Sequence, residues 1–133
     1  MALVQRLRVL VADDHPIIRK KVRAVLENNP RFDVCGEVED GAQAVQEALR
    51  VKPDVVVLNV TMPVLGGFEA AREIRAKLPE SAIVILSSHA DKHFIAEAMK
   101  VGARAYVAKT KIGEALIKAI ADAVESGDFV LVD

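Results

Sequence analysis

Hydrophobic residues in this chain alternate between short continuous runs and longer segments in which apolar positions recur every three or four residues. The short runs are rich in Val, Leu and Ile, which is typical of strands buried on both faces of a parallel sheet. Five such runs predict strands, over residues 7–12, 32–38, 54–60, 82–86 and 104–108. The segments that follow them predict five helices, because their apolar residues fall on one side of a helix with 3.6 residues per turn.

Turn and capping residues indicate where these helices begin and end. Pro16 suits the first turn of the first helix, where its missing N–H costs nothing, and the run 28–30 (Asn-Asn-Pro) stops that helix. Asp40 is a candidate N-cap for the second helix. Gly102 is a candidate C-cap for the fourth, and the fifth ends near Gly127.

Strands that alternate with helices predict an α/β domain, an open doubly wound parallel sheet with helices on both faces. We expect this domain to span residues 7–127. Residues 128–133 are apolar for a free tail, since they include the run Phe-Val-Leu-Val at 129–132. They predict either the start of a linker or an edge that packs on the body of the domain.

Composition narrows the class of protein. A chain of 133 residues, 52% of them hydrophobic, can build one proper core. The formal net charge of -1 gives no bulk attraction to nucleic acid or to anionic membranes. No apolar run approaches the length of a membrane span or of a signal peptide core, so we expect a cytoplasmic protein that contacts neither nucleic acid nor membrane directly.

Unusual polar residues stand at the carboxyl ends of the predicted strands. Asp13 and Asp14 follow the first strand, Asn59 closes the third, Ser87 follows the fourth and Lys109 follows the fifth. Because such ends meet at one edge of a parallel sheet, we expect a pocket of acids and a lysine suited to a divalent cation and a phosphoryl group. A carboxylate at position 59 could attack phosphorus, whereas a carboxamide is a poor nucleophile.

Three segments carry recognisable motifs: Arg-Val-Leu-Val-Ala-Asp-Asp-His-Pro at 8–16, Asn-Val-Thr-Met-Pro-Val-Leu-Gly-Gly at 59–67 and Gly-Ala-Arg-Ala-Tyr-Val-Ala-Lys at 102–109. Together they resemble the CheY-like receiver domain of two-component response regulators, of the kind found in helix-turn-helix transcription factors. The resemblance implies a flavodoxin-like sheet with strand order 2-1-3-4-5. It departs from the family at Asn59, where receivers carry the phosphoacceptor aspartate, and Thr110 stands where many receivers have proline.

The resemblance also implies a role for each site residue. Mg²⁺ would be held by Asp13, Asp14, position 59 and the backbone carbonyl of Thr61. The remaining roles are phosphoryl contact for Lys109 and Ser87, a two-state switch for Ser87 and Tyr106, and tuning of hydrolysis for Thr61 and His89. The implied partners are a sensor histidine kinase or phosphotransfer protein, and an output domain in a longer parent chain.

Asn59 alters the charge of this pocket. With aspartate at position 59 the pocket would hold three carboxylates and one lysine, a formal -2; with Asn59 it holds a formal -1. One charge lost about 4 Å from a cation removes on the order of 4 kcal/mol of Coulomb attraction at an effective dielectric near 20, before desolvation offsets it. We therefore expect weakened Mg²⁺ binding and a receiver that is not phosphorylated at the usual position.

Other interpretations remain open at this stage. The domain could dimerise or dock without phosphorylation, through the first and fifth helices or through the face of the fourth helix, fifth strand and fifth helix. A phosphatase on a similar sheet is disfavoured, because no second acid follows two residues after Asp13 or Asp14, and we expect no enzyme. Tyr106 could equally be a half-buried strand residue. His15 and His89 are isolated in sequence and predict no zinc site.

Overall fold

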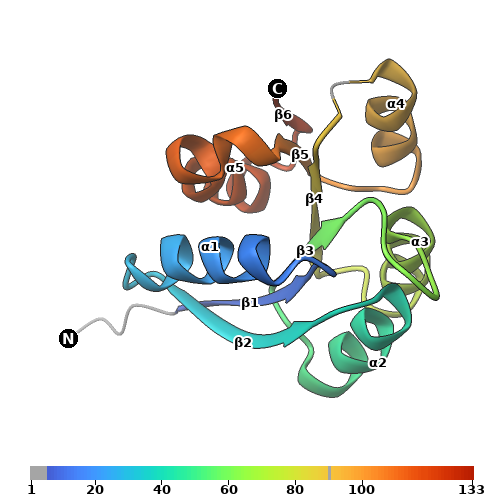
Figure 1. Ribbon diagram of the computed structural model, residues 1–133, viewed down its shortest axis with the longest axis horizontal. Helices are drawn as coiled ribbons and strands as arrows, with labels where there is room; N and C mark the ends of the chain where they lie inside the picture. Colours follow the sequence, from blue (N-terminus) through green and yellow to red (C-terminus); the bar gives the residue numbers. More distant parts are fainter. Residues whose placement is uncertain (1–5, 90) are drawn as a thin grey trace.

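The computed structural model describes residues 6–89 and 91–133. It contains one parallel six-stranded sheet in the order β2-β1-β3-β4-β5-β6, with helices on both faces (Figure 1). The strands are β1 (Leu7–Ala12), β2 (Phe32–Val38), β3 (Val55–Asn59), β4 (Ala82–Ser87), β5 (Ala105–Ala108) and β6 (Val130–Val132). The expected strand order of the first five strands is thus confirmed.

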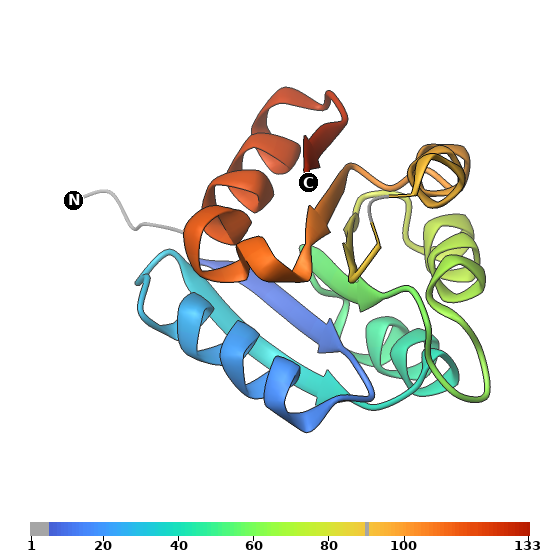
Figure 2. The same cartoon turned by 45° about the horizontal axis from the view of Figure 1, so that its top comes forward.

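Five helices cover the sheet. They are α1 (Pro16–Glu27), α2 (Gly41–Val51), α3 (Gly67–Lys77), α4 (Lys92–Lys100) and α5 (Ile112–Ser126), with a 3₁₀ turn, η1 (Lys109–Lys111), before the last. Helices α1 and α5 lie on one face, and α2, α3 and α4 lie on the other (Figure 2). No helix among residues 6–89 and 91–133 is long and apolar enough to cross a membrane.

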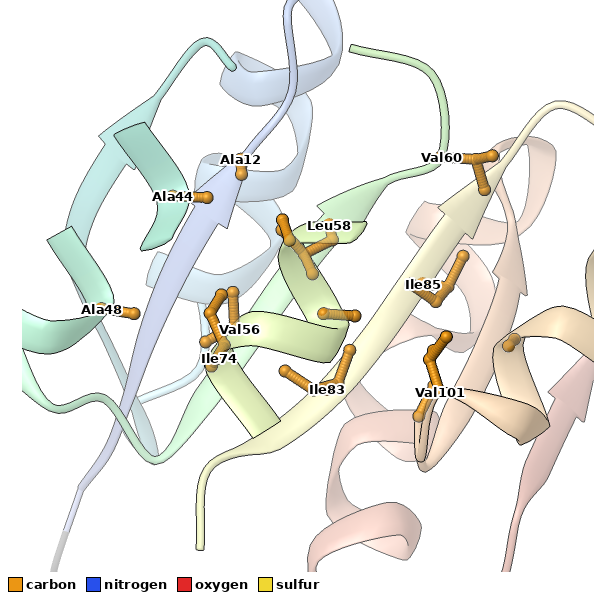
Figure 3. Packing of buried hydrophobic residues seen from close by; sticks show 14 of the residues in the cluster. Ala12, Ala44, Ala48, Val56, Leu58, Val60, Ile74, Ile83, Ile85 and Val101 are labelled. Atoms are coloured by element: carbon orange, nitrogen blue, oxygen red, sulfur yellow. The ribbon is translucent and has the colours of Figure 1, made fainter. Parts of the chain in front are cut away.

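The core has two layers because successive strand residues point to opposite faces of the sheet. Val56 and Leu58 of β3 pack toward α2 and α3 together with Ile83 and Ile85 of β4 (Figure 3). Their neighbour Val57 packs instead toward α1 and α5. Each fully buried side chain of this size contributes about 1.5–3 kcal/mol, which explains why β3 and β4 are apolar at every position before their last residue.

The capping residues act as the sequence predicts. The Asp40 side chain accepts a hydrogen bond of 2.8 Å from the Gln43 backbone N–H, which closes the start of α2. Pro16 is the first residue of α1. Gly102 and Gly127 follow α4 and α5 with φ of 86° and 76°, in the left-handed region that glycine enters without strain.

The prediction of five strands was one strand short. Of the two interpretations left open for residues 128–133, the structure shows the packed edge, because β6 pairs with β5 and places Leu131 beside Tyr106. The Val130 N–H donates to the Arg104 carbonyl at 2.9 Å. Val130 and Val132 pack toward α5, whereas Leu131 is 45% exposed.

Candidate functional site

The carboxyl ends of β1, β3, β4 and β5 meet at one edge of the sheet. Leu58 lies opposite both Ala12 and Ile85, and Ser87 lies opposite Ala108 in the strand register. The polar residues that follow these positions therefore reach the same edge. Parallel α/β sheets hold their ligands at this edge, so the fold brings the predicted residues to a place where a site can form.

Asp13 is the buried acid of this site. Its side chain is fully shielded from solvent, and its Oδ1 accepts a hydrogen bond of 2.9 Å from the His15 backbone N–H. Its Oδ2 lies 3.2 Å from Lys109 Nζ and takes part in no hydrogen bond within the part of the chain that the structure describes. A buried carboxylate is costly without a cation, so Lys109 neutralises a charge that a metal ion could also offset.

Asn59 lies at the centre of the site and is 4% exposed. Its Nδ2 donates to Asp14 Oδ1 at 3.1 Å and to the Thr61 carbonyl at 2.7 Å. Both partners are acceptors, so the amide nitrogen, and not the amide oxygen, must face Asp14 and the Thr61 carbonyl. The amide thus satisfies a carboxylate and a carbonyl, which are the kinds of oxygen ligand that a hard cation takes.

The loop between β3 and α3 is held tightly at a glycine. A Cβ on Gly67 would lie 2.0 Å from the Asn59 carbonyl oxygen, so only glycine fits there. The Gly67 N–H also donates to the Val60 carbonyl at 2.8 Å. The close approach of Gly67 holds the backbone at Asn59 and Val60 in place. Thr61, the next residue of the loop, is exposed at the rim of the site.

Ser87 and Tyr106 form a second cluster on the neighbouring strands. Ser87 Oγ accepts from the His89 N–H at 3.0 Å, and the Tyr106 hydroxyl donates to the His89 carbonyl at 2.5 Å. Tyr106 is fully buried, so the alternative of a half-buried strand residue is wrong. Burial raises the pKa of the Tyr106 hydroxyl above its ordinary value. The His89 ring itself is exposed and meets the edge of Phe94, with ring centroids 5.3 Å apart.

The structure brings predicted residues into direct contact: Asp13 pairs with Lys109, and the Asn59 amide bonds both Asp14 and Thr61. It places Ser87 at the end of β4, Tyr106 on β5 and His89 just after β4. Both sets of residues lie at or near the carboxyl ends of strands that the hydrophobic pattern predicted.

Sequence reasoning missed two residues that contact Asp13. His15 is not isolated, because its Nδ1 lies 2.9 Å from Asp13 Oδ1 and 3.2 Å from Asp14 Oδ1. Arg19 of α1 donates to the Asp13 carbonyl at 2.6 Å. For His15 the available signal was spacing, because a residue two positions after an aspartate readily donates its backbone N–H to the aspartate side chain.

Comparisons with known proteins agree with this geometry. A family model described as the response regulator receiver domain matches residues 9–121. The transcriptional regulatory protein DegU of Brevibacillus brevis is 30% identical over 125 residues, which cover 94% of this chain and 53% of that protein. The chemotaxis protein CheY of Listeria monocytogenes is 30% identical over 119 residues, covering 90% of this chain and 99% of that protein.

Solved structures give the same result. A LuxR-family two-component response regulator from Aurantimonas sp. superposes with a TM-score of 0.88 at 32% identity, covering 95% of this chain and 89% of that one. The signal receiver domain of the putative response regulator NarL from Mycobacterium tuberculosis gives 0.79 at 30% identity, covering 88% and 98%. The chain spans about half the length of DegU and of the other transcriptional regulatory proteins that it matches.

Proposed function

Because this chain belongs to the family of response regulator receiver domains, we propose that it serves two-component signalling as a receiver that takes no phosphoryl group at the usual position. In the family an aspartate there attacks a phosphohistidine. Asn59 offers an amide instead, whose oxygen is a poor nucleophile and carries no charge.

The observation that carries this proposal is the hydrogen bonding of the Asn59 amide. Its nitrogen donates to Asp14 Oδ1 and to the Thr61 carbonyl, the two groups that the resemblance assigns, with Asp13, to Mg²⁺. The N–H groups therefore stand in for the cation. The amide thereby satisfies Asp14 Oδ1 and the Thr61 carbonyl from within the protein.

The acid pair still suits a divalent cation, which supports weak Mg²⁺ binding. Asp13 Oδ2 is buried and takes part in no hydrogen bond within residues 6–89 and 91–133, and Mg²⁺ prefers such oxygen ligands. Asp13, Asp14 and the Thr61 carbonyl would hold the ion after the Asn59 amide turns away. A bound cation would offset the negative charge of an incoming phosphoryl group. The two hydrogen bonds that must break lower the affinity.

Lys109 and Ser87 are the proposed contacts for a phosphoryl group, and Tyr106 is the proposed switch partner of Ser87. Thr61 and His89 are both exposed at the rim, which suits the proposed positions for tuning hydrolysis. In a receiver that is not phosphorylated at position 59 these five residues would keep their geometry but would have no phosphoryl group to contact.

The inward position of Tyr106 favours a second candidate function. The tyrosine is fully buried and its hydroxyl donates to the His89 carbonyl, an inward arrangement that supports a switch held in one state. The domain would then act as a constitutive dimerisation or docking module, and homodimers are expected. This candidate uses the same fold and differs in needing no phosphodonor.

The partners follow from the family. We propose a cytoplasmic, non-enzymatic signalling domain that contacts a sensor histidine kinase or phosphotransfer protein. The transcriptional relatives are about twice as long as this chain, which supports an output domain in a longer parent protein. Nucleic acid would be bound by that output domain and not by the receiver itself.

The intact mass after incubation with Mg²⁺ and a small-molecule phosphodonor tests the leading proposal, with Asn59→Asp as the matched variant. We expect no phosphoryl adduct on this chain and a clear adduct on the variant, because Lys109, Asp13 and Asp14 are in place. An adduct on the unmodified chain would refute the proposal. If neither protein is modified, the pocket has diverged beyond position 59 and the docking function takes precedence.

A further inference from the structure

The last strand, β6, lies directly beside Tyr106, the residue to which the proposed function gives the role of a switch. We propose that β6, through Leu131, locks the Tyr106 side chain in its inward position. This inference rests on the switch role proposed above and adds what holds the switch in one state. It makes Leu131 a positioning residue, which acts on the site through Tyr106.

Tyr106 lies between one residue of β4 and one residue of β6. In the strand register it is opposite Ile85 on one side and Leu131 on the other. Tyr106 and Ile85 belong to the core layer that faces α2, α3 and α4. Val130 and Val132 pack on the other face, toward α5. Because successive strand residues alternate between faces, Leu131 points to the same face as Tyr106.

The hydroxyl of Tyr106 defines the inward position of the ring, because it donates to the His89 carbonyl at 2.5 Å. His89 follows β4, so this hydrogen bond holds the ring on the β4 side. Side chains turn about the Cα–Cβ bond between staggered positions. A turn that breaks the hydrogen bond and carries the ring away from β4 brings it toward β6. Leu131 occupies that side of Tyr106 on the same face of the sheet.

The exposure of Leu131 agrees with this role. A single exposed leucine on a protein surface is ordinary, and Leu131 is 45% exposed. Its neighbour across the strands, Tyr106, is nevertheless fully buried. A sheet that ended at β5 would leave the β6 side of Tyr106 open to solvent. The leucine therefore covers a side of the tyrosine that would otherwise give the ring room to turn.

Contacts on both faces of the sheet hold β6 in place. The Val130 N–H donates to the Arg104 carbonyl at 2.9 Å, and Val130 and Val132 pack toward α5. Phe129, just before the strand, packs against the core layer that contains Tyr106. The strand has only three residues, so it opens more easily than the central strands do. Release of β6 is thus the step that would free Tyr106.

Nuclear magnetic resonance of Tyr106 tests the lock, because the chain has a single tyrosine. Tyrosine labelled with carbon-13 at its ε carbons gives one ring signal, and its position in urea marks the exposed ring. Relaxation dispersion measures how often the folded protein visits an outward position. The proteins compared are the unmodified chain, Leu131→Ala and Val132→Ala. Val132 is the matched control, because it is the next β6 residue and packs on the opposite face.

We expect Leu131→Ala to raise the outward population of Tyr106 about tenfold, which corresponds to about 1.4 kcal/mol and is close to the burial of two methylene groups. Val132→Ala should change that population less than about twofold, because it removes nothing on the face of Tyr106. Deletion of residues 129–133 removes the whole strand and should move the main ring signal toward its position in urea.

An unchanged Tyr106 signal in both Leu131→Ala and the deletion variant would overturn the lock. Equal changes in Leu131→Ala and Val132→Ala would also overturn it, because they would show only a general loosening of β6. The amide spectrum of each variant verifies that it is folded. No phosphodonor is used, so failure of the lock is distinct from failure of the proposed function, which would appear as a phosphoryl adduct on the unmodified chain.

Discussion

Asn59→Asp should make the stability of this protein depend on Mg²⁺. The substitution replaces an amide donor by a carboxylate at a position 3.1 Å from Asp14 Oδ1 and 2.7 Å from the Thr61 carbonyl. Two favourable hydrogen bonds are lost, and two oxygens then face acceptors. A buried polar group without a partner is costly, so the variant needs a cation where the amide nitrogen stood.

The size of the effect can be worked from these distances. Two carboxylate charges about 3 Å apart repel by about 5 kcal/mol at an effective dielectric near 20. Asp14 is 32% exposed, so solvent screening and side-chain movement reduce this repulsion several-fold. We expect the free energy of unfolding of the variant to fall by about 2–3 kcal/mol in the presence of a metal chelator.

Mg²⁺ should reverse that loss in the variant alone. At a cation concentration about 100 times the Kd, binding adds about 2.7 kcal/mol to stability. The unmodified chain, for which the same concentration lies at or below the Kd, should gain no more than about 0.4 kcal/mol. Urea unfolding of both proteins, with chelator and with Mg²⁺, measures the four free energies.

Asn28→Asp is the control for this experiment. It makes the same chemical change at an exposed residue at the end of α1 and should show no dependence on Mg²⁺. If Asn59→Asp is as stable as the unmodified chain in chelator, the amide does not stand in for a cation. An equal gain from Mg²⁺ in the unmodified chain would refute the reasoning as well.

Two further predictions rest on single residues of the site. Tyr106 is the one tyrosine of a chain without tryptophan, so an absorbance titration follows it alone; its midpoint in the folded protein should lie above the ordinary value of 10.0, because burial raises its pKa. The stability that this shift provides should be complete below about pH 10 and should be lost as the pH rises through the folded-state pKa, and a midpoint at or below the ordinary value would contradict the buried hydroxyl. Gly67→Ala should lower the free energy of unfolding by about 1–3 kcal/mol, because its Cβ would lie 2.0 Å from the Asn59 carbonyl oxygen. Its control Gly113→Ala meets no atom within 4 Å on the exposed side of α5 and should be neutral or stabilise by up to about 1 kcal/mol; equal losses in chemical denaturation would mean that the close contact at Gly67 is not strained.

Much of the fold could be predicted because its signals are local. Each central strand is a continuous apolar run. Residues such as Pro16, Asp40 and Gly102 mark helix ends, because their own backbone or capping chemistry suits those positions. The polar strand ends follow from the same pattern, since they stand where an apolar run stops. The family could also be identified from three segments, because their motifs carry the resemblance without any knowledge of contacts.

The sixth strand could not be predicted in the same way. It has three residues, which is too short for an alternating pattern to be recognised, and it forms because the edge of β5 is open beside it. Its stability comes from backbone hydrogen bonds to a strand more than twenty residues earlier in the chain. The same apolar run without that edge would be an ordinary tail.

The sequence alone determined that this is a receiver-like α/β domain and that position 59 carries an amide in place of an acid. Only the tertiary structure decided that the amide bonds Asp14, because Asp14 follows β1 and Asn59 ends the neighbouring strand β3. The complete burial of Tyr106 and the pairing of Lys109 with Asp13 were decided there too. Local sequence sets the backbone and short-range contacts such as that of His15 with Asp13, whereas these long-range partners depend on which distant segments the fold brings within hydrogen-bonding distance.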